Sequence, residues 1–231
     1  LHLFCHLPAA LPVVFVLKQK TEYESDGRNC RSDVCSSDLG TQMIAKGLDY
    51  PNITTVGVLD ADVSLAFPDF RAGERTFQLL SQVAGRTGRG ESPGLVVIQT
   101  NRPTSLPIRC AAEQDIVGFM AAELTERKAF GWPPYGRLCR LIARSEDPHA
   151  AMRELKTAAD LIRERADELG VRILGPTVAP VARAESKYRY HMLLRSPSQQ
   201  SLVELARLLR THFKPCSAVT VVTDMNPMSV L

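Results

Sequence analysis

Hydrophobic and polar positions follow two different periods in the first half of the chain and predict a strand–helix–strand unit. A β-branched apolar run over residues 54–59 is typical of a buried parallel strand, and residues 94–100 have the same character. Between them, apolar residues recur every three to four positions over residues 71–83, which favours a helix with one buried face. This order predicts a βαβ unit and a parallel sheet. A further helix is expected over residues 113–129.

The second half predicts a smaller α+β domain with the element order βαββαβ. Strands are expected over residues 137–144, 171–184, 186–195 and 219–222, and helices over residues 148–169 and 199–213. The first helix follows an N-cap at Asp147 with Pro148 in its first turn, and Gly170 ends it. The second follows a capping box that opens at Ser196. This order is the split βαβ, or ferredoxin-like, arrangement.

The chain divides into three predicted regions: 1–39, 40–131 and 132–231. Residues 1–17 are apolar, but they are too short and too broken by proline to predict a signal peptide or a membrane anchor. Residues 18–39 read like a translated sequencing adaptor, so we expect an assembly scar that is disordered. A Pro- and Gly-containing breaker at residues 132–136 is the predicted boundary between the two folded regions.

Composition adds little except in the second folded region. The chain has 231 residues and a net charge of +3, which is too mild to imply nucleic acid by itself. Residues 132–231, however, carry 15 Lys and Arg against 10 Asp and Glu. The six cysteines are scattered, and Cys30 and Cys35 have no second pair to complete a metal site. Free thiols in a reducing cytoplasm are therefore expected.

An arginine- and glycine-rich stretch over residues 81–90 is the first candidate site. Arg86 and Arg89 lie three residues apart among glycines, which let a ligand approach the backbone. Two guanidinium forks at this spacing could hold a phosphoryl group. The alternative is a helix end with solvated arginines and capping glycines.

The surrounding sequence resembles a known family of motor proteins. Residues 40–52 open Gly-Thr-Gln-Met and, with residues 82–89, resemble motifs V and VI of superfamily 2 helicases. The segments 59–62 and 69–75 narrow the resemblance to the primosomal protein N′ (PriA) family of replication-restart helicases. It runs from about Gly40 to the end of the chain. A translocase of the RecG type is an alternative, but its motif V differs.

The resemblance implies an α/β fold with part of the second RecA-like motor lobe, and it implies site residues. Catalytic residues would be Gln82, Arg86 and Arg89, nucleotide-binding residues Lys46, Gly47 and Asp49, and a DNA-binding residue Thr41. The arginines would stabilise charge on the transferred phosphoryl group. For Lys46 and Asp49 the alternative is a solvated turn. Asp60 and Asp62 are interpreted as a strand-end turn, and no metal ligands are predicted.

A basic strand is the candidate site of the C-terminal domain. Lys187, Arg189, His191 and Arg195 alternate with apolar and aromatic residues, so they should share one face, with Arg183 nearby. A surface that follows a DNA backbone would explain the basic side chains. An ordinary half-buried antiparallel strand with its polar side in water explains the alternation equally well.

The resemblance implies a C-terminal fragment of an ATP-dependent 3′→5′ DNA helicase that acts in primosome assembly and replication restart. ATP and Mg²⁺ would serve the whole protein, and so would Zn²⁺, whose ligands have no counterpart in this chain. Expected partners are forked or single-stranded DNA, primosome proteins and single-stranded-DNA-binding protein in the cytoplasm, without a membrane. Because the chain has no GxxxxGK[ST] loop, we expect no ATP hydrolysis by it alone. A non-catalytic DNA-binding or primosome-assembly module is the alternative.

Overall fold

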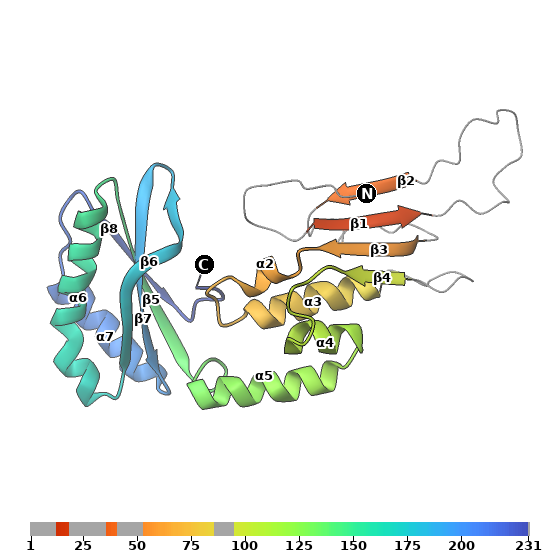
Figure 1. Ribbon diagram of the computed structural model, residues 1–231. Coiled ribbons are helices and arrows are strands. Elements are labelled where there is room, and N and C mark those ends of the chain that lie inside the picture. Colours follow the sequence, from red (N-terminus) through yellow and green to blue (C-terminus); the bar gives the residue numbers. More distant parts are fainter. Residues whose placement is uncertain (1–12, 19–35, 41–52, 86–94, 231) are drawn as a thin grey trace, which may run out of the picture. The chain divides into compact units, whose positions relative to one another are not determined.

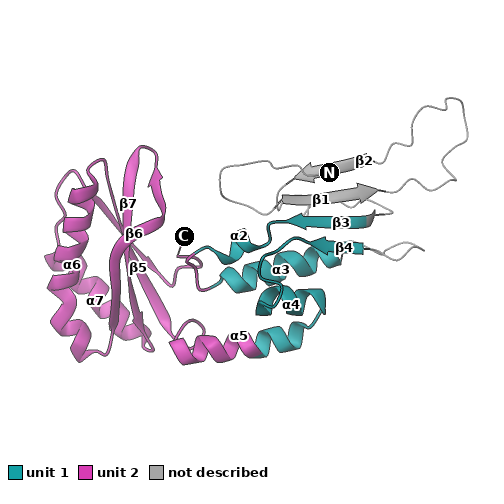
Figure 2. Cartoon of the chain, viewed as in Figure 1, with its two compact units in different colours: residues 1–67, 71–121 teal, residues 68–70, 122–231 magenta. Residues whose placement is uncertain are grey.

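The described residues form two compact units. The computed structural model describes residues 13–18, 36–40, 53–85 and 95–230 (Figure 1). The first unit comprises Leu1–Phe67 and Arg71–Ala121, and the second comprises Pro68–Phe70 and Ala122–Leu231 (Figure 2). The division therefore falls inside a helix, upstream of the breaker that the sequence offers as a boundary.

The first unit contains a four-stranded mixed sheet. Its order is β2-β1-β3-β4, with β1 (Val13–Lys18), β2 (Ser36–Gly40), β3 (Ile53–Leu59) and β4 (Leu95–Ile98). Strands β3 and β4 are parallel, with Thr55 opposite Leu95, and helices lie between them in the chain. The predicted βαβ unit is therefore confirmed.

Two strands, β1 and β2, lie within residues 1–40, where the sequence analysis predicts neither helices nor strands. Strand β1 is antiparallel to both β2 and β3, and β2 begins at Ser36 inside the adaptor-like tract. The expectation of a disordered tract is wrong for residues 36–39, because main-chain N–H and C=O groups can pair along a strand edge whatever the side chains are. Residues 19–35 lie outside the described part of the chain.

Helices cover the β3–β4 pair and supply the core of the first unit. They are α2 (Asp62–Leu65), α3 (Ala72–Ala84), α4 (Leu106–Ala112) and the start of α5 (Ile116–Phe130). Val56 and Val58 meet the predicted buried face of α3, and Phe77 stacks on Phe119 with ring centroids 4.1 Å apart. The helix expected over residues 113–129 is confirmed as α5, and α4 is a further helix that the sequence analysis did not predict, separated from α5 at Gln114 with a positive φ of 56°.

The second unit has the predicted βαββαβ order. Its elements are β5 (Arg137–Ser145), α6 (Pro148–Glu168), β6 (Arg172–Ala184), β7 (Lys187–Ser196), α7 (Gln199–His212) and β8 (Thr220–Met225). The strands form one antiparallel sheet in the order β6-β7-β5-β8. Helices α6 and α7 lie on the same side of this sheet (Figure 1). We call the opposite side the helix-free face.

Local sequence explains most element ends in this unit. The Asp147 side chain accepts from the His149 N–H at 2.9 Å at the start of α6, and Gly170 follows its end with φ +64°. The β6–β7 hairpin turns at Glu185 and Ser186, both with positive φ, as a two-residue turn of this kind requires.

The predicted capping box at Ser196 is wrong. The N-cap of α7 is Ser198, whose hydroxyl accepts from the Ser201 N–H at 3.3 Å. Ser196 still belongs to β7, and its hydroxyl accepts from the Ser198 N–H at 3.1 Å. The helix begins later because Ser198 keeps extended backbone angles.

Candidate nucleic-acid interface

The helix-free face carries the basic side chains of two adjacent strands. In β5, Cys139 and Leu141 belong to the core beneath the helices, and in β7, Met192 and Leu194 do. Since side chains alternate along a strand, the residues between them lie on the helix-free face. These are Leu138, Arg140, Ile142 and Arg144 in β5, and Lys187, Arg189, His191, Leu193 and Arg195 in β7. The shared face predicted for the β7 residues is confirmed.

The strand register sets which charges meet. Arg144 lies directly opposite Arg189 in the β5–β7 pair. On the other side of β5, Arg140 lies opposite Asp224 of β8, and their side chains form an ion pair of 3.1 Å. The acid thus balances Arg140, whereas Arg144 has Thr220 as its partner in β8.

Burial and neighbouring charge lower the pKa values of Arg189 and His191 on this face. The pKa of Arg189 is lowered by desolvation first, and then by the charges of Arg144 and Arg140. The pKa of His191 is lowered by desolvation, and then by Arg140 and Arg189. Only 8% of His191 is exposed. A histidine with this lowered pKa is mainly neutral at pH 7, so it does not add to the positive charge of the face.

Arg183 does not join the other β7 residues. It pairs in register with Tyr188, and its guanidinium carbon lies 5.1 Å from the centre of the Tyr188 ring. Since paired residues of adjacent strands share a face, Arg183 lies on the opposite side from Lys187 and Arg189. A register irregularity between Val178 and Arg183 accompanies this placement.

Two stacked aromatic rings with a cation on each outer side lie beside the basic strand. The guanidinium of Arg195 lies 5.1 Å from the Trp132 ring, which stacks on Phe70 at 5.6 Å, and Arg127 lies 5.5 Å from the Phe70 ring. Asp69, next to Phe70, accepts from the Ser229 hydroxyl at 2.7 Å. Sequence reasoning missed this group because its members are far apart in the chain. The signal was Trp132, the chain's one tryptophan, inside the supposed breaker.

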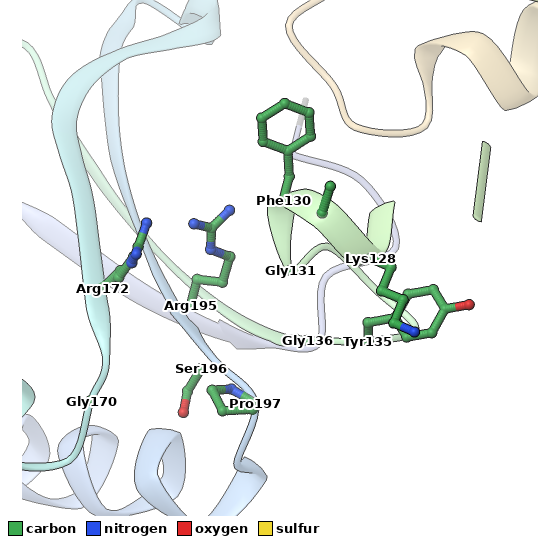
Figure 3. A pocket seen from close by; sticks show the side chains of 11 residues that line it. Lys128, Phe130, Gly131, Tyr135, Gly136, Gly170, Arg172, Arg195, Ser196 and Pro197 are labelled. Atoms are coloured by element: carbon green, nitrogen blue, oxygen red, sulfur yellow. The ribbon is translucent and has the colours of Figure 1, made fainter. Parts of the chain in front are cut away.

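A pocket of about 310 Å³ opens next to this stack (Figure 3). Its lining residues are Lys128, Ala129, Phe130, Gly131, Tyr135, Gly136, Gly170, Arg172, Arg195, Ser196 and Pro197. Arg172 and Arg195 are directly opposite each other in the β6–β7 pair, and Figure 3 shows both side chains beside the same opening. The pKa of Arg195 is lowered by desolvation and then by Arg172. The pocket is therefore suited to an anion.

Only one end of the arginine- and glycine-rich stretch is described. Gln82 is exposed in the last turn of α3, and Gly85 is the C-cap residue with φ −70°. A Cβ added to Gly85 would meet the Ser81 carbonyl oxygen at 3.5 Å, an ordinary contact. The helix end therefore does not require glycine here, which weakens the capping explanation. Among the predicted site residues, those outside the described part of the chain are Thr41, Lys46, Gly47, Asp49, Arg86 and Arg89.

Asp62 joins the ends of the parallel strands β3 and β4. Its carboxylate accepts from the Thr100 hydroxyl at 2.7 Å and from the Asn101 N–H at 2.5 Å. These bonds agree with the interpretation of Asp62 as part of a strand-end turn. Within residues 53–85 and 95–230, no group of three or more His, Cys, Asp or Glu residues is placed to hold a metal ion.

The cysteines of the described residues are free thiols. Cys110 and Cys139 are buried and Cys216 is exposed. Burial, and then the charge of Asp224, raise the pKa of Cys139 to about 12, so this thiol is unreactive. No helix among the described residues has the length and apolar character needed to cross a bilayer.

Comparison with known proteins agrees with this architecture. Residues 128–228 match the family model described as "Primosomal protein N C-terminal domain". Three relatives named "Replication restart protein PriA" align over most of the chain. They come from Treponema pallidum (42% identity, 84% of this chain), Bacillus subtilis (39%, 84%) and Synechocystis (38%, 83%). The chain spans 29%, 24% and 23% of the lengths of these relatives, respectively.

Among solved structures, the protein titled "De novo designed protein Foldit4" covers 40% of the chain at 13% identity, with a TM-score of 0.32. That score is too low to bear on the fold. The sequence relatives and the family model carry the assignment. The chain belongs to the replication restart protein PriA family, and its residues 128–228 are the C-terminal domain of that family.

Proposed function

We propose that this chain is part of an ATP-dependent 3′→5′ DNA helicase of replication restart, and that its second unit holds the DNA backbone. The helix-free face is the observation that carries the proposal for the second unit. It gathers Arg140 and Arg144 from β5 with Lys187, Arg189 and Arg195 from β7. Guanidinium groups match the geometry of phosphate oxygens, and a surface of this kind reads backbone and not bases.

Charge balance supports a nucleic-acid ligand over a merely solvated surface. The ion pair between Arg140 and Asp224 brings an acid to this face, but the cross-strand pair Arg144 and Arg189 has no acid of its own among the described residues. Like charges placed directly opposite each other in a sheet are unfavourable. A polyanion that lies across the two strands would remove this repulsion.

In this proposal the first unit contributes part of the second RecA-like motor lobe. The parallel β3–β4 pair with α3 between its strands is compatible with such a lobe. Gln82 and Gly85 lie at the end of α3, where the local fold does not require a glycine. A ligand could therefore approach the backbone there, and Arg86 and Arg89 follow in the sequence.

ATP and Mg²⁺ would belong to the whole protein, where hydrolysis would supply the energy for strand separation. Lys46, Gly47 and Asp49 would contact the nucleotide, and Thr41 the DNA, as family members of this type are expected to do. Gln82, Arg86 and Arg89 would act on the phosphoryl group. Primosome proteins and single-stranded-DNA-binding protein would be the partners, in the cytoplasm, and Zn²⁺ would bind elsewhere in the whole protein.

The DNA-binding part of the proposal is tested on the purified 231-residue chain. Fluorescence anisotropy should detect binding to labelled oligonucleotides of unrelated sequence with similar affinities, and the affinity should fall steeply between 50 and 200 mM salt, roughly tenfold or more for a few phosphate contacts. No binding at the lower salt concentration would contradict the proposal for the second unit.

The helicase part needs a longer protein. A chimera that joins the preceding part of the Bacillus subtilis relative to this chain from Gly40 onward should hydrolyse ATP when DNA is added, whereas the chain alone should not. DNA-stimulated hydrolysis by the chain alone would contradict the expectation that it cannot hold the nucleotide. A folded chimera that binds nucleotide and DNA but never hydrolyses ATP would contradict the motor assignment.

A further inference from the structure

The cross-strand pair Arg144 and Arg189 places two positive charges directly opposite each other, which is electrostatically unfavourable. The two residues are directly opposite in the β5–β7 register, and each is only partly exposed. Opposed like charges in a sheet cost free energy, so a sheet that only had to be stable would place an acid or a neutral residue at one of these positions. The same sheet does place an acid opposite another arginine: Asp224 of β8 lies directly opposite Arg140 of β5 and forms an ion pair with it.

The Nε atoms of Arg144 and Arg189 add a second, independent observation. Both are withdrawn from solvent, and neither has a hydrogen-bond partner among the described residues. A buried donor without an acceptor is rare in native proteins and destabilises the folded state. Two such donors in directly opposed residues are what a site for a shared acceptor would present before its ligand arrives.

Two buried residues lie beside these arginines on the helix-free face. Ile142 comes two residues before Arg144 on the same face and is almost fully buried, and His191, which lies opposite Ile142, is 8% exposed. Long side chains that lie along such a surface keep their charged ends at its border. The lowered pKa of Arg189, caused by desolvation and then by Arg144 and Arg140, agrees with a guanidinium group held partly out of water.

We propose that Arg144 and Arg189 form a two-strand clamp for a single phosphate group of nucleic acid. Each guanidinium can donate through Nε and a terminal nitrogen, so two of them can engage several oxygens of one tetrahedral phosphate at once. The inference rests on the proposed DNA binding and adds Arg144, on a different strand, to the site. Lys187, next on the same face of β7, would continue the contact to the neighbouring part of the backbone.

The first test asks whether the two arginines share one phosphate. The variants are Arg144→Gln, Arg189→Gln and the double variant, with Arg207→Gln on the exposed side of α7 as the control for loss of one charge. Binding to an oligothymidylate is measured at several salt concentrations. Each single variant should weaken binding about tenfold and the double variant little more, because either arginine alone cannot close the clamp.

The salt dependence of binding tests the same point, because it counts the phosphate contacts that each variant loses. One lost phosphate contact lowers the slope of log affinity against log salt by about 0.7 for a single strand. If the two arginines share one phosphate, each single variant should lose about 0.7 of slope, and the double variant should lose the same amount and no more. Two separate phosphates predict about twice the loss in the double variant, and that result, or an unchanged slope in all three, overturns the clamp. Arg207→Gln should leave the slope unchanged.

A second measurement needs no substitution and so does not depend on a variant that folds. In the unaltered chain, the Nε–Hε resonances of Arg144 and Arg189 are followed by NMR during titration with oligothymidylate, with an uncharged methylphosphonate analogue, and with inorganic phosphate. The phosphodiester strand should shift both resonances and the neutral analogue neither.

The outcomes separate the clamp from the proposed function. Shifts with inorganic phosphate but not with the oligonucleotide would support a phosphate clamp and contradict DNA as its ligand. DNA binding that leaves both resonances unmoved would support DNA binding by the chain and overturn the clamp.

Discussion

On the side of the unit-2 sheet that α6 and α7 cover, Met192 and Leu194 of β7 are fully buried. On the other side, the same strand presents Arg189 and Lys187. One alternating sequence therefore makes a side that forms the core of the domain and a side on which like charges lie directly opposite each other. The second side concentrates like charges and buried donors, which is expected of a surface shaped by a ligand and not by folding alone.

The covered side should show the largest effect of substitution. Leu194→Ala removes a fully buried side chain from the core that α6 and α7 share with the sheet. We expect it to lower the free energy of unfolding by about 2–5 kcal/mol, because the deletion leaves a cavity. Urea denaturation of the purified chain measures this loss. A change below about 1 kcal/mol would mean that the two sides do not differ as described.

The cation–aromatic stack should come next. Trp132→Ala removes the stack on Phe70 and the contact with Arg195, so a loss of about 2 kcal/mol is expected. Tyr135→Ala is the matched control, since Tyr135 is 46% exposed and should matter little to stability. Equal losses in the two variants would show that the stack adds nothing specific.

How far the sequence predicts these results depends on the range of each interaction. The βαββαβ order follows from local information, namely the alternation of β7, the cap at Asp147 and the stop at Gly170. The partnership of Arg144 with Arg189 depends on the register between β5 and β7, which no local pattern fixes. The stack of Phe70 on Trp132 joins residues more than sixty positions apart, so no local sequence pattern predicts it either.

Shorter-range failures have local causes. The N-cap of α7 is Ser198 and not the predicted Ser196, because two serines at this spacing offer equivalent hydroxyl groups and the sequence does not distinguish them. Helix α4, which the sequence analysis did not predict, has only seven residues and is separated from α5 at Gln114, whose positive φ no local pattern predicts. The strand at Ser36–Gly40 shows that main-chain pairing can use a sequence without an apolar period.

On the helix-free face, removing an arginine should stabilise the folded chain and not destabilise it. Arg144→Gln removes one of two opposed like charges and one buried donor. We expect the free energy of unfolding to rise by about 0.5 kcal/mol in the absence of DNA. Urea denaturation at low salt, with Arg207→Gln as the control, measures the change. A clear destabilisation by Arg144→Gln alone would mean that this arginine serves the fold.

His191 should give the smallest effect, visible only as a pH dependence. Its pKa is lowered by desolvation and by Arg140 and Arg189, while Ile142 and Thr177, opposite it in register, carry no charge. The unfolded chain therefore takes up this proton first as the pH falls below about 6.5. Stability should be fully present above that value and decline below it.

His191→Gln should remove that part of the decline. Urea midpoints at pH 7.5 and 5.5 are compared in the unaltered chain and in the variant. The difference between the two pH values should be smaller in the variant, because glutamine does not titrate. An identical pH dependence in the two proteins would show that His191 binds its proton equally well in the folded and unfolded chain.

The measurement that tests the account most directly is the salt dependence of DNA binding by the double variant Lys187→Gln/Arg189→Gln. Its control, Arg207→Gln/Arg210→Gln, removes the same charge from α7 on the covered side. If the helix-free face follows the DNA backbone, the first variant should bind duplexes of every sequence more weakly, with a salt slope reduced by about 0.9 for each lost phosphate contact. The control should keep the slope of the unaltered chain. Equal slopes in all three proteins would contradict the assignment of DNA binding to this face.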